Sequence, residues 1–423
     1  MRPGSAWTKR VSTMPAATCR ILSLLLLVGL WQSALCSDAP LGLSAIHQLV
    51  TERKVSSVEE LLSQLPTQYR SRFTLVFASR SLQGASFENP RVILYGADAQ
   101  FILTFNGNAQ DRGVESVEML EFDPSARQFA LQELTFRASP DGESSAEFSA
   151  INPEKCVGCH GKVSRPVWDT YPLWPGAYGE VHQERPSAAE IEGFEGFLRQ
   201  QPAHPRYRHL MGVQAFAYRY RFSPTAREKY DAVQVESPNE ELSVFLNRLN
   251  AQSIAAEIVR QEAFATHRYA LLAAASRDCI DMEEFFPDDL RAAIRQRLRE
   301  FSDLSDAINT RQLESKRDRL LPGSRLRGLA LASSIDDADS LKRLRFMAET
   351  TLGLDTHAWT LALEKGSSDF TAPHRAIDEI ERAMLDEVAL GDRHVKALRV
   401  YGSPGGNSKY CSYLARQNRA SLN

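Results

Sequence analysis

Residues 152–161 read Asn-Pro-Glu-Lys-Cys-Val-Gly-Cys-His-Gly, and they separate two parts of the chain that have different sequence patterns. The stretch holds one Cys-x-x-Cys-His motif, made of Cys156, Cys159 and His160. With 6 cysteines and 9 histidines among 423 residues, composition alone predicts roughly 0.002 such motifs by chance. The motif therefore indicates a specific chemistry.

The spacing of the two cysteines fits the covalent attachment of one haem c. Two thiols three residues apart can reach the two vinyl groups of a haem and form thioethers, and the imidazole of the next residue then lies under the iron. A zinc site would need a fourth ligand, which the neighbouring sequence does not supply. A thioredoxin-like dithiol would need a βαβ unit with a longer helix after the motif. That segment is instead broken by Pro166, Pro172 and Pro175.

On this motif, the region of about residues 150–180 resembles the c-type cytochromes, and specifically their single-haem members. The resemblance implies haem c bound covalently by Cys156 and Cys159, with His160 as the proximal iron ligand. The layout NPEKCVGCHG followed by RPVWDTYPLWPGAYG also resembles a group of exported bacterial proteins without a settled function. No mechanism is carried over from that group.

The start of the motif differs from that of small soluble cytochromes, which place an amphipathic helix just before it. Here Asn152, as an N-cap, and Pro153, at the first helical position, predict that the motif opens a short helix of its own. We expect the haem to lie between the two parts of the chain.

The residues after the motif suggest how the haem is surrounded. Arg165 is a candidate partner for a haem propionate, and the carbonyl of Pro166 or of a neighbour is expected to accept a hydrogen bond from the proximal imidazole. Four aromatic residues are expected to wall the haem: Trp168, Tyr171, Trp174 and Tyr178.

The sequence does not name the sixth iron ligand. Chain order favours the segment just after the aromatic loop, because successive elements tend to be adjacent in space. The candidates are Met211, His182, His204 and His209, with His267 more distant. An ordered sixth ligand would favour electron transfer, whereas five-coordinate iron would favour ligand binding or catalysis.

The N-terminus has the pattern of a secretory signal peptide. Lys9, Arg10 and Arg20 precede an apolar run over 21–31, which is too short to span a bilayer, and small residues follow it. Lipid attachment at Cys36 is not expected, because the residues before it do not fit a lipoprotein signal. We therefore expect a periplasmic chain without a transmembrane segment.

Before the motif, the pattern predicts a helical region over 41–65 and then an antiparallel meander of four or five strands. Apolar residues at helical spacing support the first, and aromatic or β-branched runs separated by turn residues support the second. The expected strands cover 73–77, 92–95, 101–105, 117–122 and 129–136, with turns at 96–99 and 123–125. Residues 138–145 are polar and are predicted to be a connector.

After about residue 185 the pattern is helical. Capping residues predict helices that begin near Ser187, Ser237 and Asp288, and further helices are expected over 341–351 and 376–390. The fold class is therefore predicted to be α+β. The predicted divisions are a signal peptide over 1–36, an α+β domain over 37–147, a haem-attachment segment over 148–185 and a helical domain over 186–423.

The balance of 50 basic and 53 acidic residues gives a net charge of −3, so the chain has no basic excess for nucleic acid. Cys279 and Cys411 are left over and, in an oxidising compartment, are expected to form a disulfide rather than two free thiols.

Together these patterns predict a periplasmic mono-haem protein that transfers single electrons and has no catalytic residues. Its expected partners are the cytochrome c maturation machinery and an unidentified redox protein. Two alternatives stay open: a haem-based module that binds or senses a small ligand, and a haem redox enzyme. The enzyme alternative is weaker, because exported bacterial haem peroxidases carry two Cys-x-x-Cys-His motifs, whereas this chain has one.

Overall fold

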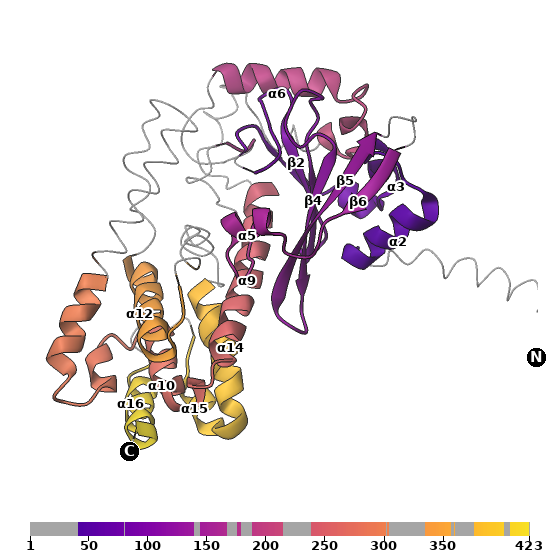
Figure 1. The fold of residues 1–423 in the computed structure, drawn as a ribbon. Helices are drawn as coiled ribbons and strands as arrows, with labels where there is room; N and C mark the ends of the chain where they lie inside the picture. Colours follow the sequence, from indigo (N-terminus) through magenta and orange to yellow (C-terminus); the bar gives the residue numbers. More distant parts are fainter. Residues whose placement is uncertain are drawn as a thin grey trace, which may run out of the picture. The chain divides into compact units, whose positions relative to one another are not determined.

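The computed structural model describes residues 41–79, 81–138, 144–166, 176–178, 188–214, 238–301, 303, 335–356, 359, 376–401 and 407–422. These residues all belong to one unit of the fold, which begins at Leu41. The predicted signal peptide lies outside them, as do Trp168, Tyr171, Trp174 and His182. The α+β class is confirmed, with an antiparallel sheet in the N-terminal half and most helices after it (Figure 1). No helix in the described ranges is long and apolar enough to cross a membrane.

The sheet is a six-stranded meander in which every strand pairs antiparallel with its neighbours in chain order. Its strands are β1 (Phe73–Val76), β2 (Arg91–Tyr95), β3 (Phe101–Phe105), β4 (Ser116–Asp123), β5 (Gln128–Ala138) and β6 (Ser144–Phe148). The sixth strand was not predicted. It begins at Ser144, near the end of the predicted connector over 138–145, and residues 139–143 of that connector lie outside the described residues. Strand β6 is an edge strand and pairs only with β5, so it can form from the polar sequence Ser-Ser-Ala-Glu-Phe.

Both predicted turns are confirmed. Gly96 N–H donates to the carbonyl of Phe101 (3.2 Å) and closes the hairpin between β2 and β3. Between β4 and β5, the Asp123 carboxylate accepts hydrogen bonds from the backbone N–H groups of Ser125 and Ala126 (2.7 and 3.1 Å). These side-chain contacts replace backbone partners that the tight turn cannot provide.

Alternation along the strands gives the sheet two buried faces. One face, here called the α2 face, carries Phe101 and Leu103 and packs against the helices that precede the sheet and against α6. The other, the α9 face, carries Ile102 and Leu120 and packs against leucines of α9. The helices that contribute to these two cores are α2 (Leu43–Arg53), α3 (Val58–Gln64), α4 (Thr67–Arg70), α6 (Ala188–Gln200) and α9 (Pro238–Val259).

The predicted helical region over 41–65 is divided into α2 and α3. Lys54 adopts a left-handed conformation (φ 52°) at the end of α2, and the Ser57 hydroxyl then caps α3 by accepting from Glu60 N–H (3.1 Å).

The remaining helices form a separate apolar core around Trp359, Leu344 and Met384, all fully buried. They are α10 (Phe264–Ala275), η3 (Met282–Phe285), a helix over 291–301, α12 (Ile335–Leu352), α14 (Ala376–Gly391), α15 (Arg393–Leu398) and α16 (Ser408–Leu422). A disulfide joins Cys279 to Cys411 across 132 residues, so the predicted pairing is confirmed. The predicted helix starts near Ser187, Ser237 and Asp288 also agree with the structure.

Candidate functional site

The motif opens the short helix α5 (Glu154–His160), as predicted. The helix begins one residue later than expected, with Pro153 at the N-cap. Asn152 instead pairs with β5: its Oδ1 accepts from Leu131 N–H (2.9 Å), and its own N–H donates to the Leu131 carbonyl (2.7 Å). These two bonds anchor the start of α5 to the sheet.

The three motif residues share one side of α5. Cys156, Cys159 and His160 occupy positions i, i+3 and i+4, which are neighbours on a helix surface. Both cysteines are free thiols; Cys156 is half-buried against the α9 face, and Cys159 is exposed. Burial, and then the charge of Glu118, raise the pKa of the Cys156 thiol, so it is protonated at neutral pH.

His160 is held by a hydrogen bond to the backbone. Its Nδ1 lies 2.6 Å from the carbonyl oxygen of Arg165. A carbonyl only accepts, so Nδ1 carries the proton and Nε2 keeps its lone pair. Burial lowers the pKa of His160 despite this hydrogen bond, and the ring is therefore neutral. The predicted carbonyl partner is confirmed, and it belongs to Arg165, the neighbour of Pro166.

The turn after α5 brings this carbonyl back to the imidazole. Gly161 ends the helix at φ 83° and ψ 165°, a region that is essentially restricted to glycine, and its N–H donates to the Val157 carbonyl (2.9 Å). Arg165 N–H then donates to the His160 carbonyl (3.1 Å). His160 and Arg165 are thus joined by two hydrogen bonds, one through the backbone and one through the ring.

The side chain of Arg165 has a different partner from the predicted propionate. It is 3% exposed, and its Nη2 donates to Glu257 of α9 at 2.5 Å. The same Glu257 oxygen accepts from the indole N–H of Trp359 (3.0 Å). In this structure the guanidinium therefore forms an internal ion pair with the helical half of the chain, and the contact with a propionate stays a prediction.

The α9 face also carries a polar network whose charges act on His160. Arg91 donates to Glu118 (2.7 Å), to Thr104 (2.9 Å) and to the side-chain carbonyl of Gln83 (2.9 Å). Glu118 raises and Arg91 lowers the pKa of His160, so their opposite effects partly cancel. The network supplies fixed charges beside the imidazole.

The structure places three of the described candidates for the sixth ligand away from α5, and the fourth, His267, lies in α10. The ring of His204 stacks on Tyr207 (4.0 Å between centroids), and its Nδ1 accepts from the backbone N–H groups of Arg206 and Tyr207 (3.2 Å each). Tyr207 and Leu210 lie in the core of the α2 face, whereas Cys156 packs against the α9 face. His209 and Met211, the latter 40% exposed, belong to the same segment.

The expectation drawn from chain order was therefore wrong for His204, His209 and Met211, because the sheet lies between their segment and α5. His182 is outside the described residues. Tyr178, expected to wall the haem, is also buried in the core of the α2 face, where its hydroxyl donates to the Phe87 carbonyl (2.7 Å).

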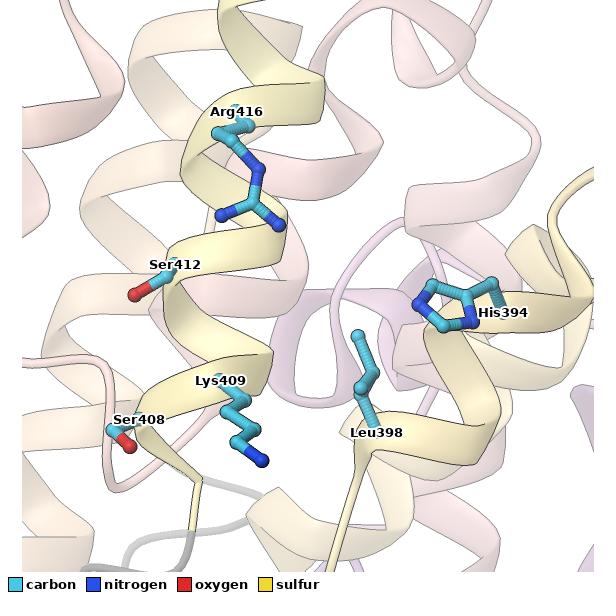
Figure 2. Close-up of a pocket in the computed structure, with 6 residues that line it drawn as sticks. All are labelled: His394, Leu398, Ser408, Lys409, Ser412 and Arg416. Carbon is cyan, nitrogen blue, oxygen red and sulfur yellow. The ribbon is translucent and has the colours of Figure 1, made fainter.

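A surface hollow of about 300 Å³ lies apart from the motif, between α15 and α16. Figure 2 shows His394 and Leu398 of α15 facing the α16 residues. Those residues are Ser408, Lys409, Ser412 and Arg416. The hollow is basic and open, and no motif residue lines it.

The sequence pattern missed the roles of Glu257 and Trp359. They lie 92 and about 194 residues beyond Arg165, and a glutamate within a long helix usually indicates a solvated surface.

The chain matches no protein-family model, and comparisons with curated proteins and with solved structures found no match. Within the described ranges, no group of three or more His, Cys, Asp or Glu side chains is arranged to hold a metal ion. The Cys-x-x-Cys-His motif on α5 therefore remains the feature that bears on function.

Proposed function

We propose that the chain is a periplasmic protein that carries one covalently bound haem c and transfers single electrons between partner proteins. The observation that carries the proposal is the arrangement on α5: two free thiols and a neutral imidazole share one helix side, and the imidazole keeps Nε2 available. The signal-like N-terminus supports export to the compartment where haem c is attached. The maturation machinery and a redox protein are the proposed partners.

The residues present fit the group that the motif implies. Cys156 and Cys159 would hold the haem through two thioether bonds, and His160 Nε2 would bind its iron. When bound, the haem supplies an iron that alternates between the ferrous and ferric states and so carries one electron. The Arg165 carbonyl fixes the ring orientation of His160 and increases its donor strength.

The charged neighbours of His160 would tune the reduction potential. Glu118 and Arg91 form an ion pair on the α9 face; the carboxylate raises and the guanidinium lowers the pKa of His160. A carboxylate near the iron favours the more positive ferric state, and a guanidinium opposes this effect. If His160 binds the iron, the charges that shift the pKa of its imidazole would therefore include both signs.

A second candidate function is a haem-based module that binds a small ligand at an open iron position. The observation that favours it is that His204 stacks on Tyr207 and Met211 follows Leu210. Tyr207 and Leu210 both lie in the core of the α2 face, whereas Cys156 packs against the α9 face. Without a sixth ligand from the protein, the iron would have a free coordination position.

Absorption spectra of the reduced protein with and without carbon monoxide decide between the two candidates. Electron transfer predicts a low-spin spectrum that carbon monoxide leaves unchanged. A high-spin spectrum that shifts when carbon monoxide is added would contradict electron transfer and support the ligand-binding function. His160→Ala is the control, because it removes the proximal ligand in either case.

A further inference from the structure

One carboxylate on α9 joins two segments that are distant in sequence. Glu257 Oε2 accepts from Arg165 Nη2 (2.5 Å) and from Trp359 Nε1 (3.0 Å). Arg165 is 3% exposed and Trp359 is fully buried, so water cannot replace either bond at low cost. The Glu257 carboxylate on α9 therefore joins two segments by hydrogen bonds: the turn after α5, through Arg165, and the helical core, through Trp359.

Arg165 connects the Glu257 carboxylate to the motif. Its side chain pairs with Glu257, while its carbonyl accepts from His160 Nδ1–H (2.6 Å) and its N–H donates to the His160 carbonyl (3.1 Å). Its Nη1 makes one long contact to the Val163 carbonyl (3.4 Å), and its buried Nε has no hydrogen-bond partner in the described part of the chain. Glu257 is thus the main partner of this guanidinium.

We infer that Glu257 is a positioning residue for His160: through Arg165 it holds the turn over 161–165, so that the Arg165 carbonyl keeps the imidazole in the Nδ1–H tautomer with Nε2 available. The inference rests on the proposed function where Nε2 is taken as the iron ligand. The hydrogen bond from Nδ1–H to the Arg165 carbonyl is a property of the polypeptide, and the exchange of its proton can be measured whether or not haem is attached.

The physical reason is the cost of a buried charge without a partner. If Glu257 loses its charge, the guanidinium of Arg165 is left in an apolar environment and moves toward water. Its backbone moves with it, because the turn is only five residues long and begins at the glycine-restricted conformation of Gly161. The Arg165 carbonyl then no longer holds the Nδ1 proton of His160.

The test compares Glu257→Gln with Glu262→Gln in the full chain, expressed with its N-terminal signal and labelled with ¹⁵N-histidine. Glu262 is an exposed carboxylate just beyond the end of α9, so its variant removes the same charge without touching Arg165. The measurements are the ¹⁵N shifts of His160, the exchange rate of its Nδ1 proton, and covalent haem by mass spectrometry. Backbone amide exchange in β3 reports whether the fold is intact.

We expect Glu257→Gln to speed exchange of the Nδ1 proton by about two- to tenfold, the effect of losing one hydrogen bond between neutral groups. The exchange rate in Glu262→Gln and the β3 amide rates should not change. Glu257→Asp keeps the charge and should restore part of the protection. If Glu257→Gln does not fold, Trp359→Phe removes one donor to the carboxylate and should give a smaller increase.

An Nδ1 exchange rate that is the same in Glu257→Gln and wild type would overturn the inference. If haem is attached and the rate is unchanged, the positioning role fails while the proposed function stands. If no haem is attached but Glu257→Gln still speeds exchange, the positioning role stands and the proposed function fails.

Discussion

Replacing Gly161 by alanine should destabilise the protein at the end of α5. The residue adopts φ 83° and ψ 165°, and a side chain in this region costs about 1–3 kcal/mol. Alanine also lowers the entropy of the unfolded chain, which offsets about 0.4–1 kcal/mol of that cost. The net loss in the free energy of unfolding is therefore about 1–2 kcal/mol. The turn that carries the Arg165 carbonyl would shift as well.

Gly158→Ala is the matched control, because this glycine lies three residues earlier and inside α5. A Cβ atom there meets nothing within 4 Å, and alanine is favoured over glycine in a helix by about 0.5–1 kcal/mol. Both variants keep Cys156, Cys159 and His160. The two substitutions should therefore change the free energy of unfolding with opposite signs.

Urea denaturation followed by circular dichroism measures both free energies, and the amount of attached haem per chain reports on the site. We expect Gly161→Ala to be less stable than wild type and Gly158→Ala to be equal or more stable. If Gly161→Ala were as stable as Gly158→Ala, the positive φ of Gly161 would be refuted. The hydrogen bond between His160 and the Arg165 carbonyl, which depends on this turn, would then be refuted as well.

Three further outcomes follow from other contacts. Replacing Cys279 and Cys411 together by serine should lower stability by about 5 kcal/mol in the chain-entropy model, because the bond closes 132 residues; equal melting with and without reductant would contradict this. Burial raises the pKa of Glu59, but the hydrogen bond and charge of Arg206 outweigh it, and the pKa lies below 4.5. The stability from this pair is thus complete above pH 4.5 and lost as pH falls below it, so Glu59→Gln should flatten the acid limb of a stability–pH curve. Met211→Ala should leave the haem spectrum unchanged, and a conversion to high spin would refute the placement of its segment, in which the preceding Leu210 is buried against the α2 face.

The sequence pattern predicts the central strands well, because their aromatic and β-branched runs reflect burial on both faces of the sheet. It misses β6, whose polar residues need only one neighbouring strand. The motif likewise predicts α5 and the carbonyl partner of His160, since both depend on residues within a short stretch.

Long-range features of the site could not be predicted in this way. Alternation shows which strand residues share a face, but it does not show which later segment covers that face. The residues over 204–211 were therefore expected near His160, although they pack against the α2 face. The Arg165–Glu257 pair joins residues 92 positions apart, and neither residue type indicates by itself that it is buried.

Covalent attachment of haem by Cys156 and Cys159 is tested most simply by the reduced spectrum of denatured protein in alkaline pyridine. We expect one c-type haem per chain, retained after acid extraction, and its loss in the variant with Cys156→Ala and Cys159→Ala. Haem that extracts freely, or zinc bound in its place, would contradict covalent attachment.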